Sequence, residues 1–428
     1  MIDINLIREN PELVKNNMKK KFQEEKIIIV DEVKQLDAKW KKLKYDEDGL
    51  RAERNKVSKN INELKKVGKS ATAELKRAKK IPEEIAKIEI KRKELEKKID
   101  YLIKQIPNIM HESVPKGRTE ENNPVLRKWG KIPKKDFKLM THSEIAEKLG
   151  IADFDAGRSN SGQGFNYLIG DLAELDYALQ KYGVDFIKKK GFTQIIPPLM
   201  LNHETLLGAL NGLEDFEQVV YKIDKENLYL IGTAEHTLVS LFKDKILNEK
   251  NLPIKLFAVT PCFRKEIGSR GVDTKGLYRM HQFNKVEQVV FCKSEDSYKF
   301  LEVMQSITEE FFQSLEIPYQ VIEICSGDLG AKFAKQYDIE AWFPRQDKYC
   351  EVTSAGSCTD FQSRALNTKI ESKGERKYPH VLNNTMIATS RAMVAILENF
   401  QNKDGTIDIP KVLQPYMGDK KKIGVKNK

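Results

Sequence analysis

The 428-residue sequence has no apolar run of about 18 residues, the length that a membrane-spanning helix needs, so no transmembrane segment is predicted. Residues 1–22 lack the apolar stretch of a secretory signal peptide, and Asp3, Glu9 and Glu12 are atypical of an organellar transit peptide. With 40% apolar and 32% charged residues, the composition is typical of a cytoplasmic protein of about two or three domains.

Cysteine is also sparse. The five cysteines lie at positions 262, 292, 325, 350 and 358, and their spacing matches neither a disulfide framework nor the CxxC pair of a zinc site. We therefore expect buried, reduced thiols and no zinc.

Acidic charge is comparatively scarce at the N-terminal end. Residues 1–110 contain 29 Lys and Arg against 20 Asp and Glu, which accounts for most of the net charge of +11. A basic excess confined to one segment indicates either an anionic partner for that segment or merely a soluble helical surface. Charge alone does not separate the two.

The same segment carries two heptad patterns. Apolar positions step by three and four residues over 33–64 and again over 78–106, with Gly68 between them. These patterns predict an antiparallel hairpin of two helices, each of about 32 residues and about 48 Å long. Pairing residues whose numbers sum to about 138 or 139 aligns the apolar layers and places Glu47 opposite Arg92. Since the stripes cover each other, we expect no apolar face for a globular core and an arm that projects into solvent.

The rest of the sequence divides into three parts. Residues 111–160 contain prolines, glycines and polar clusters, and we interpret them as a linker and entry segment. Residues 161–418 alternate helical and strand-like segments, which predicts one large α+β domain. The lysine-rich end, 419–428, is predicted to be a disordered tail.

The stretch RKEIGSRGVDTKGLYR, residues 264–279, combines five basic side chains with three glycines between strand-like flanks. Residues two apart on a strand share a face, so Arg264 and Glu266 would lie together. On the returning strand, one face would likewise carry Phe283, Lys285 and Glu287. Acids on this face argue against a nonspecific RNA grip and favour a site for a small ligand with an anion, a flat ring and a cation.

Motif by motif, the chain resembles the class II aminoacyl-tRNA synthetases and, among them, the seryl-tRNA synthetases. FRKE and the run GSRGVDTKGLYRMHQFNKVE resemble their motif 2. The stretch 191–200 resembles the dimer-forming motif 1, which ends at Pro198, and 233–235 resembles the serine-recognising segment. The block with the ATP-binding glutamate is matched by 327–364, and motif 3 by 383–402.

This resemblance covers nearly the whole chain and implies an α+β fold in a homodimer. Residues 1–110 would form an N-terminal antiparallel two-helix coiled-coil arm that binds tRNA. A class II synthetase antiparallel-sheet catalytic domain, with about six or more strands, would follow over 161–418.

The resemblance also implies a reaction. The enzyme would activate L-serine with ATP and Mg²⁺, form seryl-adenylate and pyrophosphate, and transfer serine to the 3′ end of serine tRNA. Selenocysteine tRNA is an open alternative acceptor. The arm would bind the long variable arm of the tRNA, and the loop residues Arg270, Lys275 and Arg279 would face its acceptor end.

Site residues follow from the family pattern. Arg264 bridges the serine carboxylate and the α-phosphate, Glu266 binds the adenine amino group, and Arg391 stacks on adenine opposite Phe283. Arg264, Glu266 and Arg391 are therefore the implied catalytic residues. The implied ATP-binding set is Arg264, Lys265, Glu266, Met280, Phe283, Glu351, Val352, Thr353, Ser354 and Arg391, and the implied Mg²⁺ ligands are Glu351 and Ser354.

For serine, the pattern makes Glu287 the acceptor of the hydroxyl group. Alanine would leave this charged acceptor unpaired, which is worth roughly 10⁴-fold rejection. The implied serine-binding set is Thr233, Ala234, Glu235, Arg264, Glu287, Asn383 and Thr385. His236 and His281 are expected to be structural hydrogen-bonding groups, since this reaction needs no general base near neutral pH.

The chain departs from the family pattern at two places. Asn383-Asn384-Thr385 stands where Asn-Gly-Ser or Asn-Gly-Thr is common, and Asn384 tolerates the positive φ that glycine would allow. Ala355-Gly356-Ser357 stands where Cys-Ser-Asn is usual. We interpret both as variation around an intact site. Two rival functions are a relative that loads a carrier protein and a non-catalytic RNA-binding scaffold.

Overall fold

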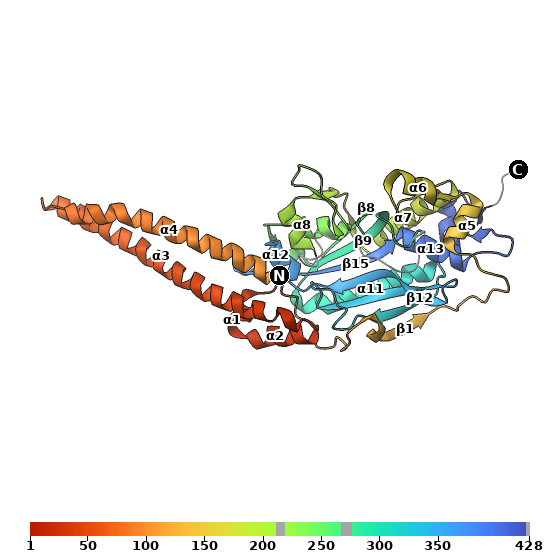
Figure 1. Cartoon of the computed structure of the whole chain (residues 1–428), viewed down its shortest axis with the longest axis horizontal. Coiled ribbons are helices and arrows are strands. Elements are labelled where there is room, and N and C mark those ends of the chain that lie inside the picture. The colour runs from red at the N-terminus through yellow and green to blue at the C-terminus, as the bar shows by residue number, and fades with distance from the viewer. Residues whose placement is uncertain (211–218, 267–275, 425–428) are drawn as a thin grey trace. The chain divides into compact units, whose positions relative to one another are not determined.

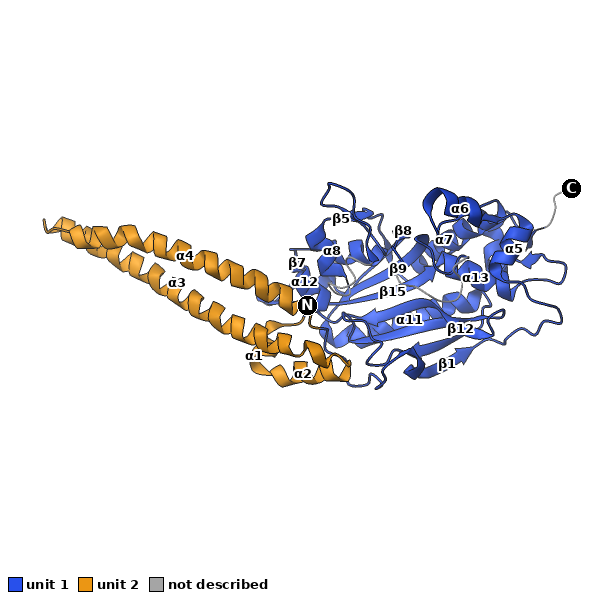
Figure 2. Cartoon of the chain, in the orientation of Figure 1, with its two compact units in different colours: residues 1, 107–428 blue, residues 2–106 orange. Residues whose placement is uncertain are grey.

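The computed structural model describes residues 1–210, 219–266 and 276–424. It divides into two compact units, one made of Ile2–Ile106 and the other of Met1 with Pro107–Lys428 (Figure 2). Each unit is described by itself.

The first unit is a helical hairpin with two short helices at its base. Helices α3 (Ile28–Lys66) and α4 (Thr72–Ile103) run side by side (Figure 1). Glu47 is buried in α3 and accepts a hydrogen bond from Arg92 Nε at 3.0 Å, which confirms the predicted register. The stepped seams over 33–64 and 78–106 therefore do encode an antiparallel coiled coil.

The base of this unit differs from the prediction. Helix α3 has 39 residues rather than about 32, because it continues toward the N-terminus where α1 (Ile4–Glu9) and α2 (Pro11–Lys20) contact it. An ion pair of 2.7 Å joins Arg8 to Asp37. The apolar stripe of α3 therefore packs against α1 and α2 as well as α4, which forms a small core at the base of the hairpin. The short 3₁₀ turn η1 (Glu24–Lys26) connects α2 to α3.

The second unit is built on a large sheet, so the α+β prediction is confirmed. Within the described residues eight strands join in the order β1-β10-β11-β12-β15-β9-β8-β4. Their bounds are β1 Val125–Trp129, β10 Tyr319–Glu323, β11 Lys335–Phe343, β12 Lys348–Ser357, β15 His380–Ala388, β9 Gln282–Cys292, β8 Ile254–Phe263 and β4 Thr193–Gln194. Neighbouring strands are antiparallel except β4 and β8, which are parallel.

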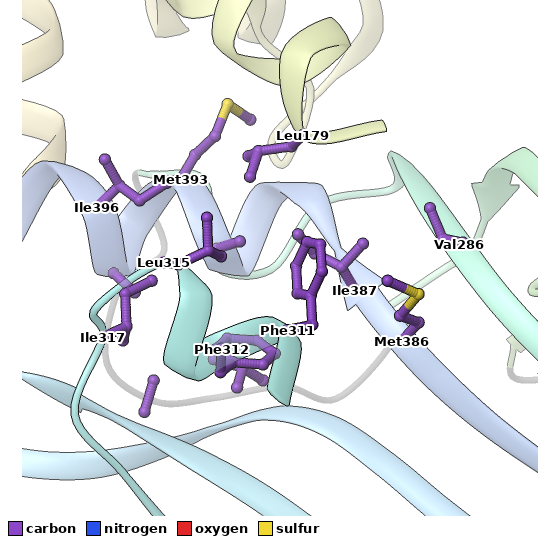
Figure 3. Packing of buried hydrophobic residues seen from close by; sticks show 14 of the residues in the cluster. Leu179, Val286, Phe311, Phe312, Leu315, Ile317, Met386, Ile387, Met393 and Ile396 are labelled. Atoms are coloured by element: carbon purple, nitrogen blue, oxygen red, sulfur yellow. The ribbon is translucent and has the colours of Figure 1, made fainter. Parts of the chain in front are cut away.

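Three amphipathic helices pack against this sheet and form its core. They are α7 (Asp171–Lys189), α11 (Ser297–Ser314) and α13 (Thr389–Asn399). Figure 3 shows how the apolar side chains meet there: Leu179, Val286, Phe311, Phe312, Leu315, Ile317, Met386, Ile387, Met393 and Ile396. Because strand side chains alternate, the burial of Val286 in this core leaves Lys285 and Glu287 on the other face of β9.

The other face of the sheet carries α10 (Ala234–Ser240) and α8 (His203–Ala209). Leu238 and Val239 of α10 belong to a separate apolar cluster with Ala258 and Val289. This cluster fixes the start of α10, where part of the predicted site lies.

Smaller elements complete this unit. They are α5 His142–Leu149, α6 Phe154–Ser161, α12 Phe361–Ala365, β2 Ala152–Asp153, β3 Tyr167–Leu168, β5 Met200–Leu201, β6 Tyr229–Leu230, β7 Ile246–Asn248, β13 Lys369–Ser372, β14 Glu375–Lys377, β16 Ile407–Asp408, β17 Lys422–Ile423, and the 3₁₀ turns η2 Glu120–Asn122, η3 Glu249–Asn251, η4 Ser294–Asp296 and η5 Lys411–Met417. No helix within the described ranges is both long and apolar enough to cross a membrane.

The predicted linker and the predicted tail both contribute regular elements to this unit. The linker 111–160 supplies the edge strand β1 and the helix α5, whose N-terminus has a capping box from Thr141 and Glu144. Residues 419–424, expected to belong to a disordered tail, include β17, which pairs with β16 and buries Ile423 completely. The lysines that suggested disorder lie beside one buried apolar residue, Ile423. Residues 425–428 lie outside the described ranges.

Candidate active site

A cavity of about 360 Å³ lies where β9, β12 and β15 meet the starts of α10 and α13. All the site residues expected from sequence line it except Ala234 and Lys265. Ala234 is buried at the start of α10, and the backbone N–H of Lys265 donates to Val219 O at 3.0 Å. The expected site residues that line the cavity thus come from five separate stretches of sequence.

Glu287 is 1% exposed and projects from β9. Its Oε2 atom accepts hydrogen bonds from Lys285 Nζ at 2.6 Å and from Thr385 Oγ1 at 3.2 Å. Burial raises the pKa of Glu287, and the neighbouring Lys285 opposes the shift. A buried carboxylate that lines the cavity is suited to accept a hydrogen bond from a hydroxyl group.

Glu235 is the second buried carboxylate of the cavity and lies in the first turn of α10. Its backbone N–H donates to Thr233 Oγ1 at 3.2 Å, which caps the helix. Its Oε1 atom accepts from Lys332 Nζ and, at 2.8 Å, from Gln362 Nε2. Burial alone would raise the pKa of Glu235, but Lys332 together with His236 and Gln362 opposes burial, and the pKa is lowered. Glu235 is therefore charged and can bind a cation.

Arg264 lies directly after β8. Its Nε donates to Gly232 O at 3.0 Å, and its guanidinium lies 5.4 Å from the centre of the Phe283 ring. Glu266 has a φ of 47°, so the chain has left the strand there. The expectation that strand alternation places Arg264 and Glu266 on one face is wrong, yet both line the cavity because the chain turns back toward it.

Arg391 comes from the first turn of α13. Its Nη1 donates to Glu351 Oε1 at 2.8 Å, and its guanidinium lies 4.8 Å from the centre of the Tyr278 ring. Burial would lower the pKa of Arg391, but Glu351 and Tyr278 raise it overall. Phe283 is thus paired with Arg264, and Arg391 with Tyr278. Stacking of one adenine between Phe283 and Arg391 stays a prediction.

A β-bulge at Val352 brings the implied magnesium ligands to one face of β12. Thr353 pairs with Ile339, but Glu351 pairs with Glu340, so one extra residue is inserted between them. In a regular strand Glu351 and Ser354 would face opposite sides. With the bulge they share a face with Asp338, and burial together with Glu351 holds the pKa of Asp338 well above its usual range.

These oxygen atoms fit Mg²⁺. A carboxylate and a hydroxyl on one face suit an ion that takes one or two protein ligands and completes its shell with water and phosphate. The described residues contain no cluster of three His, Cys, Asp or Glu side chains arranged to hold a metal by themselves.

Tyr278, Lys285 and Lys332 are among the lining residues that were given no role from sequence. The period of two along β9 did place Lys285 on the working face, so the signal was present. Lys332 lies in a turn, where no periodicity applies. Of the loop cations, Arg279 lines the cavity and lies 3.7 Å from Glu266, whereas Arg270 and Lys275 lie outside the described residues.

The two histidines, both expected to be structural hydrogen-bonding groups, differ: His281 makes such a contact, whereas the buried Nδ1 atom of His236 has no partner among the described residues. His236 is buried, and burial lowers its pKa to about 3, so the ring is neutral. His281 contacts Tyr221 Oη through its Nδ1 atom at 2.6 Å and stacks on Phe165. Neither arrangement indicates a catalytic base.

The two departures from the family pattern have structural reasons. Asn384 lies within β15, and its Nδ2 donates to Met304 O at 2.8 Å and to Thr308 Oγ1 at 2.9 Å, anchoring the sheet to α11. It does not adopt a positive φ, so tolerance of that conformation is not why asparagine fits. Gly356 lies under the ring of Phe333, where a Cβ would not fit.

Comparison with known proteins identifies the family. Residues 1–110 match the seryl-tRNA synthetase N-terminal domain, and residues 219–400 match the tRNA synthetase class II core domain (G, H, P, S and T). The serine–tRNA ligase of Methanospirillum hungatei is 44% identical over 423 residues, which is 98% of this chain and 99% of that protein. The serine–tRNA ligase of Pyrococcus horikoshii is 45% identical over 450 residues, covering 100% of this chain and 99% of that one.

Solved structures extend the comparison to the fold. The seryl-tRNA synthetase of Pyrococcus horikoshii, complexed with ATP, has a TM-score of 0.92 at 45% identity and covers 99% of both chains. The cytoplasmic serine–tRNA ligase of Naegleria fowleri, in complex with AMP, has a TM-score of 0.87 at 34% identity over 100% of this chain and 99% of that one. The chain therefore belongs to the seryl-tRNA synthetase family of class II aminoacyl-tRNA synthetases.

Proposed function

We propose that this protein is a serine–tRNA ligase that activates L-serine with ATP and transfers it to serine tRNA. The observation that carries the proposal is the composition of one cavity. Two buried carboxylates, Glu235 and Glu287, lie in it together with the guanidinium groups of Arg264 and Arg391. A zwitterionic amino acid with a hydroxyl group and an anionic nucleotide are complementary to this set.

Serine binds with each of its polar groups facing an opposite partner. Its α-ammonium lies against Glu235 and its hydroxyl against Glu287, with Thr385 and Asn383 beside the latter. Its carboxylate lies against Arg264, whose side chain is held by the carbonyl of Gly232. Fixing the carboxylate in this way is the positioning that attack on the α-phosphate requires.

ATP binds across the bulged part of β12 and the start of α13. Adenine occupies the side of the cavity with the rings of Phe283 and Tyr278, and Glu266 accepts from its amino group. Arg264 neutralises the α-phosphate as negative charge develops, and Arg391 stacks on adenine opposite Phe283. A magnesium ion held by Glu351 and Ser354 would supply further charge neutralisation on the phosphate oxygens, with Val352 and Thr353 beside them.

Transfer requires a second substrate, serine tRNA, and we assign its binding to the coiled-coil unit with its basic excess. Selenocysteine tRNA remains an alternative acceptor. Assembly as a homodimer is proposed through the segment 191–200, in which Ile196 is 93% exposed. A cytoplasmic location stays a prediction from the composition and the N-terminal sequence.

The experiment is serine-dependent exchange between pyrophosphate and ATP, followed by aminoacylation of serine tRNA. Exchange and charging with serine, but not with alanine or threonine, support the proposal. Exchange without charging of tRNA would favour the relative that loads a carrier protein. Absence of exchange in a folded, ATP-binding preparation would favour the non-catalytic scaffold.

A further inference from the structure

The two carboxylates of the proposed serine pocket are both bound by buried lysines. Lys285 pairs with Glu287 and Lys332 pairs with Glu235, and each of the four side chains is at most 8% exposed. Lys285 is two residues from its partner on one strand. Lys332 is 97 residues from Glu235 in sequence, so this second pair exists only because of the fold.

The two oxygen atoms of Glu235 have different surroundings. Oε1 accepts from both Lys332 Nζ and Gln362 Nε2, whereas no donor to Oε2 is recorded among the described residues. Glu235 also lines the cavity. One oxygen is therefore anchored to the protein, and the other is left for a cation in the cavity.

The turn that carries Lys332 is fixed from outside the cavity. Asn108, which is 4% exposed, donates through Nδ2 to Lys332 O and to Cys358 O, both at 2.9 Å. The backbone N–H of Ala334 donates to Ser357 O at 2.8 Å. A lysine side chain is flexible and loses conformational entropy when it forms an ion pair. The fixed backbone on both sides of Lys332 makes this loss smaller.

The other titratable groups near Glu235 do not replace Lys332. His236 is neutral, since burial lowers its pKa to about 3, and Cys358 is a neutral thiol, since burial raises its pKa to about 12. The nearby Glu287 has the same sign of charge as Glu235. The two other nearby cations have different partners: Arg264 donates a hydrogen bond to Gly232 O, and Lys285 forms an ion pair with Glu287.

We propose that Lys332 is a positioning residue for the amino-acid substrate. Its ammonium group holds Glu235 charged and in one orientation, so that Oε2 faces the α-ammonium of the bound amino acid. Lys332 makes no contact with the substrate itself. The inference rests on the proposed function, because it takes Glu235 as the group that binds that ammonium.

The first test is Lys332→Met, assayed by serine-dependent pyrophosphate–ATP exchange from about pH 6 to 9. A buried carboxylate without its counter-charge binds a proton more readily, and a protonated Glu235 cannot pair with an ammonium. We expect the KM for serine to rise at least about tenfold near pH 7 and to recover as the pH increases, with the KM for ATP unchanged within about twofold. Lys332→Arg, which keeps the charge, should restore most of the serine affinity.

Lys335→Met is the matched control. Lys335 begins β11, three residues after Lys332, and it pairs with Glu323 at 3.2 Å with similar burial. It does not line the cavity. Loss of this pair should lower the melting temperature without changing the pH profile of the serine KM.

A double variant guards against simple unfolding. The double variant Glu235→Gln/Lys332→Met removes both charges of the pair, so neither is left buried without a partner. When Glu235 is already Gln, the further change Lys332→Met should alter the KM for serine by less than about threefold. The inference is overturned if the two effects multiply, if the KM of Lys332→Met rises equally at all pH values, or if it does not rise. If Glu235→Gln alone binds serine normally, it is the pocket assignment of the proposed function that fails.

Discussion

The ring of Phe333 lies directly against the backbone of Gly356: a Cβ atom at Gly356 would lie 2.3 Å from the ring Cδ1 atom. Phe333 follows Lys332 and also lines the cavity. The glycine, which departs from the serine usual in the family, is thus matched to an aromatic ring on the neighbouring turn. The two positions must change together.

We expect Gly356→Ser to lower the free energy of unfolding by about 1–3 kcal/mol, because the added atoms force the ring out of its place. Phe333→Ala should relieve that clash, so the double variant should be more stable than the sum of the two single effects allows. Urea unfolding of all four proteins measures the coupling. Additive losses would show that the cost of the added atoms does not come from a clash with the Phe333 ring.

The second prediction concerns the hydroxyl acceptor. We expect Glu287→Ala to reduce serine-dependent exchange by the value of a charged hydrogen bond, about 1.5–3 kcal/mol or more, with the KM for ATP nearly unchanged. Discrimination against alanine should fall in parallel, because no buried acceptor would then be left unpaired. Exchange assays with serine and alanine measure both quantities. An equal loss of ATP affinity would contradict the assignment of Glu287.

The third prediction is that Arg264→Lys is not a mild change. A lysine keeps the charge but loses the planar fork that can span a carboxylate and a phosphate. It also loses the Nε–H that Gly232 O accepts at 3.0 Å. Adenylate formation should fall at least about 10²-fold in single-turnover measurements. Activity within about threefold of the parent would remove Arg264 from this role.

Regular elements explain what the sequence predicted correctly. Heptad spacing located both long helices, and one pair of polar interruptions, Glu47 and Arg92, was enough to set their register. Alternation along β9 placed Lys285 and Glu287 on one face, because that strand is regular there. In both cases the fixed period of the element determines which face a side chain at a given sequence position occupies.

Irregular elements explain what was missed. The bulge at Val352 reverses the alternation of side chains between the two faces of β12. The residue type at that position does not indicate a bulge. Glu266 reaches the cavity through a positive φ rather than through a strand. Lys332 pairs with Glu235 from a turn whose backbone is bound by Asn108, a residue far away in the sequence. Such contacts depend on tertiary structure and leave no local pattern.

The last prediction concerns the coiled coil. In the register that the Glu47–Arg92 pair indicates, Leu43 would lie opposite Leu95. Residues 44–94 can therefore be replaced by a short Gly/Ser linker without disturbing the base of the hairpin. The ion pair between Arg8 and Asp37 and the contacts of α1 and α2 with α3 are all retained. The replaced segment contains 16 Lys and Arg against 10 Asp and Glu.

Serine activation should survive this replacement, because every residue assigned to ATP or serine lies in the other compact unit. Charging of serine tRNA should fall steeply, since the lost cations would no longer meet phosphate groups. Each such contact contributes a slope of roughly −0.7 to −0.9 to the dependence of log affinity on log salt concentration, so the shortened protein should also show a flatter salt dependence. Pyrophosphate exchange, aminoacylation and tRNA binding at several salt concentrations measure the three effects. Loss of activation would make the hairpin tip part of the catalytic fold, and charging at the parent rate would show that its basic surface has no role in binding tRNA.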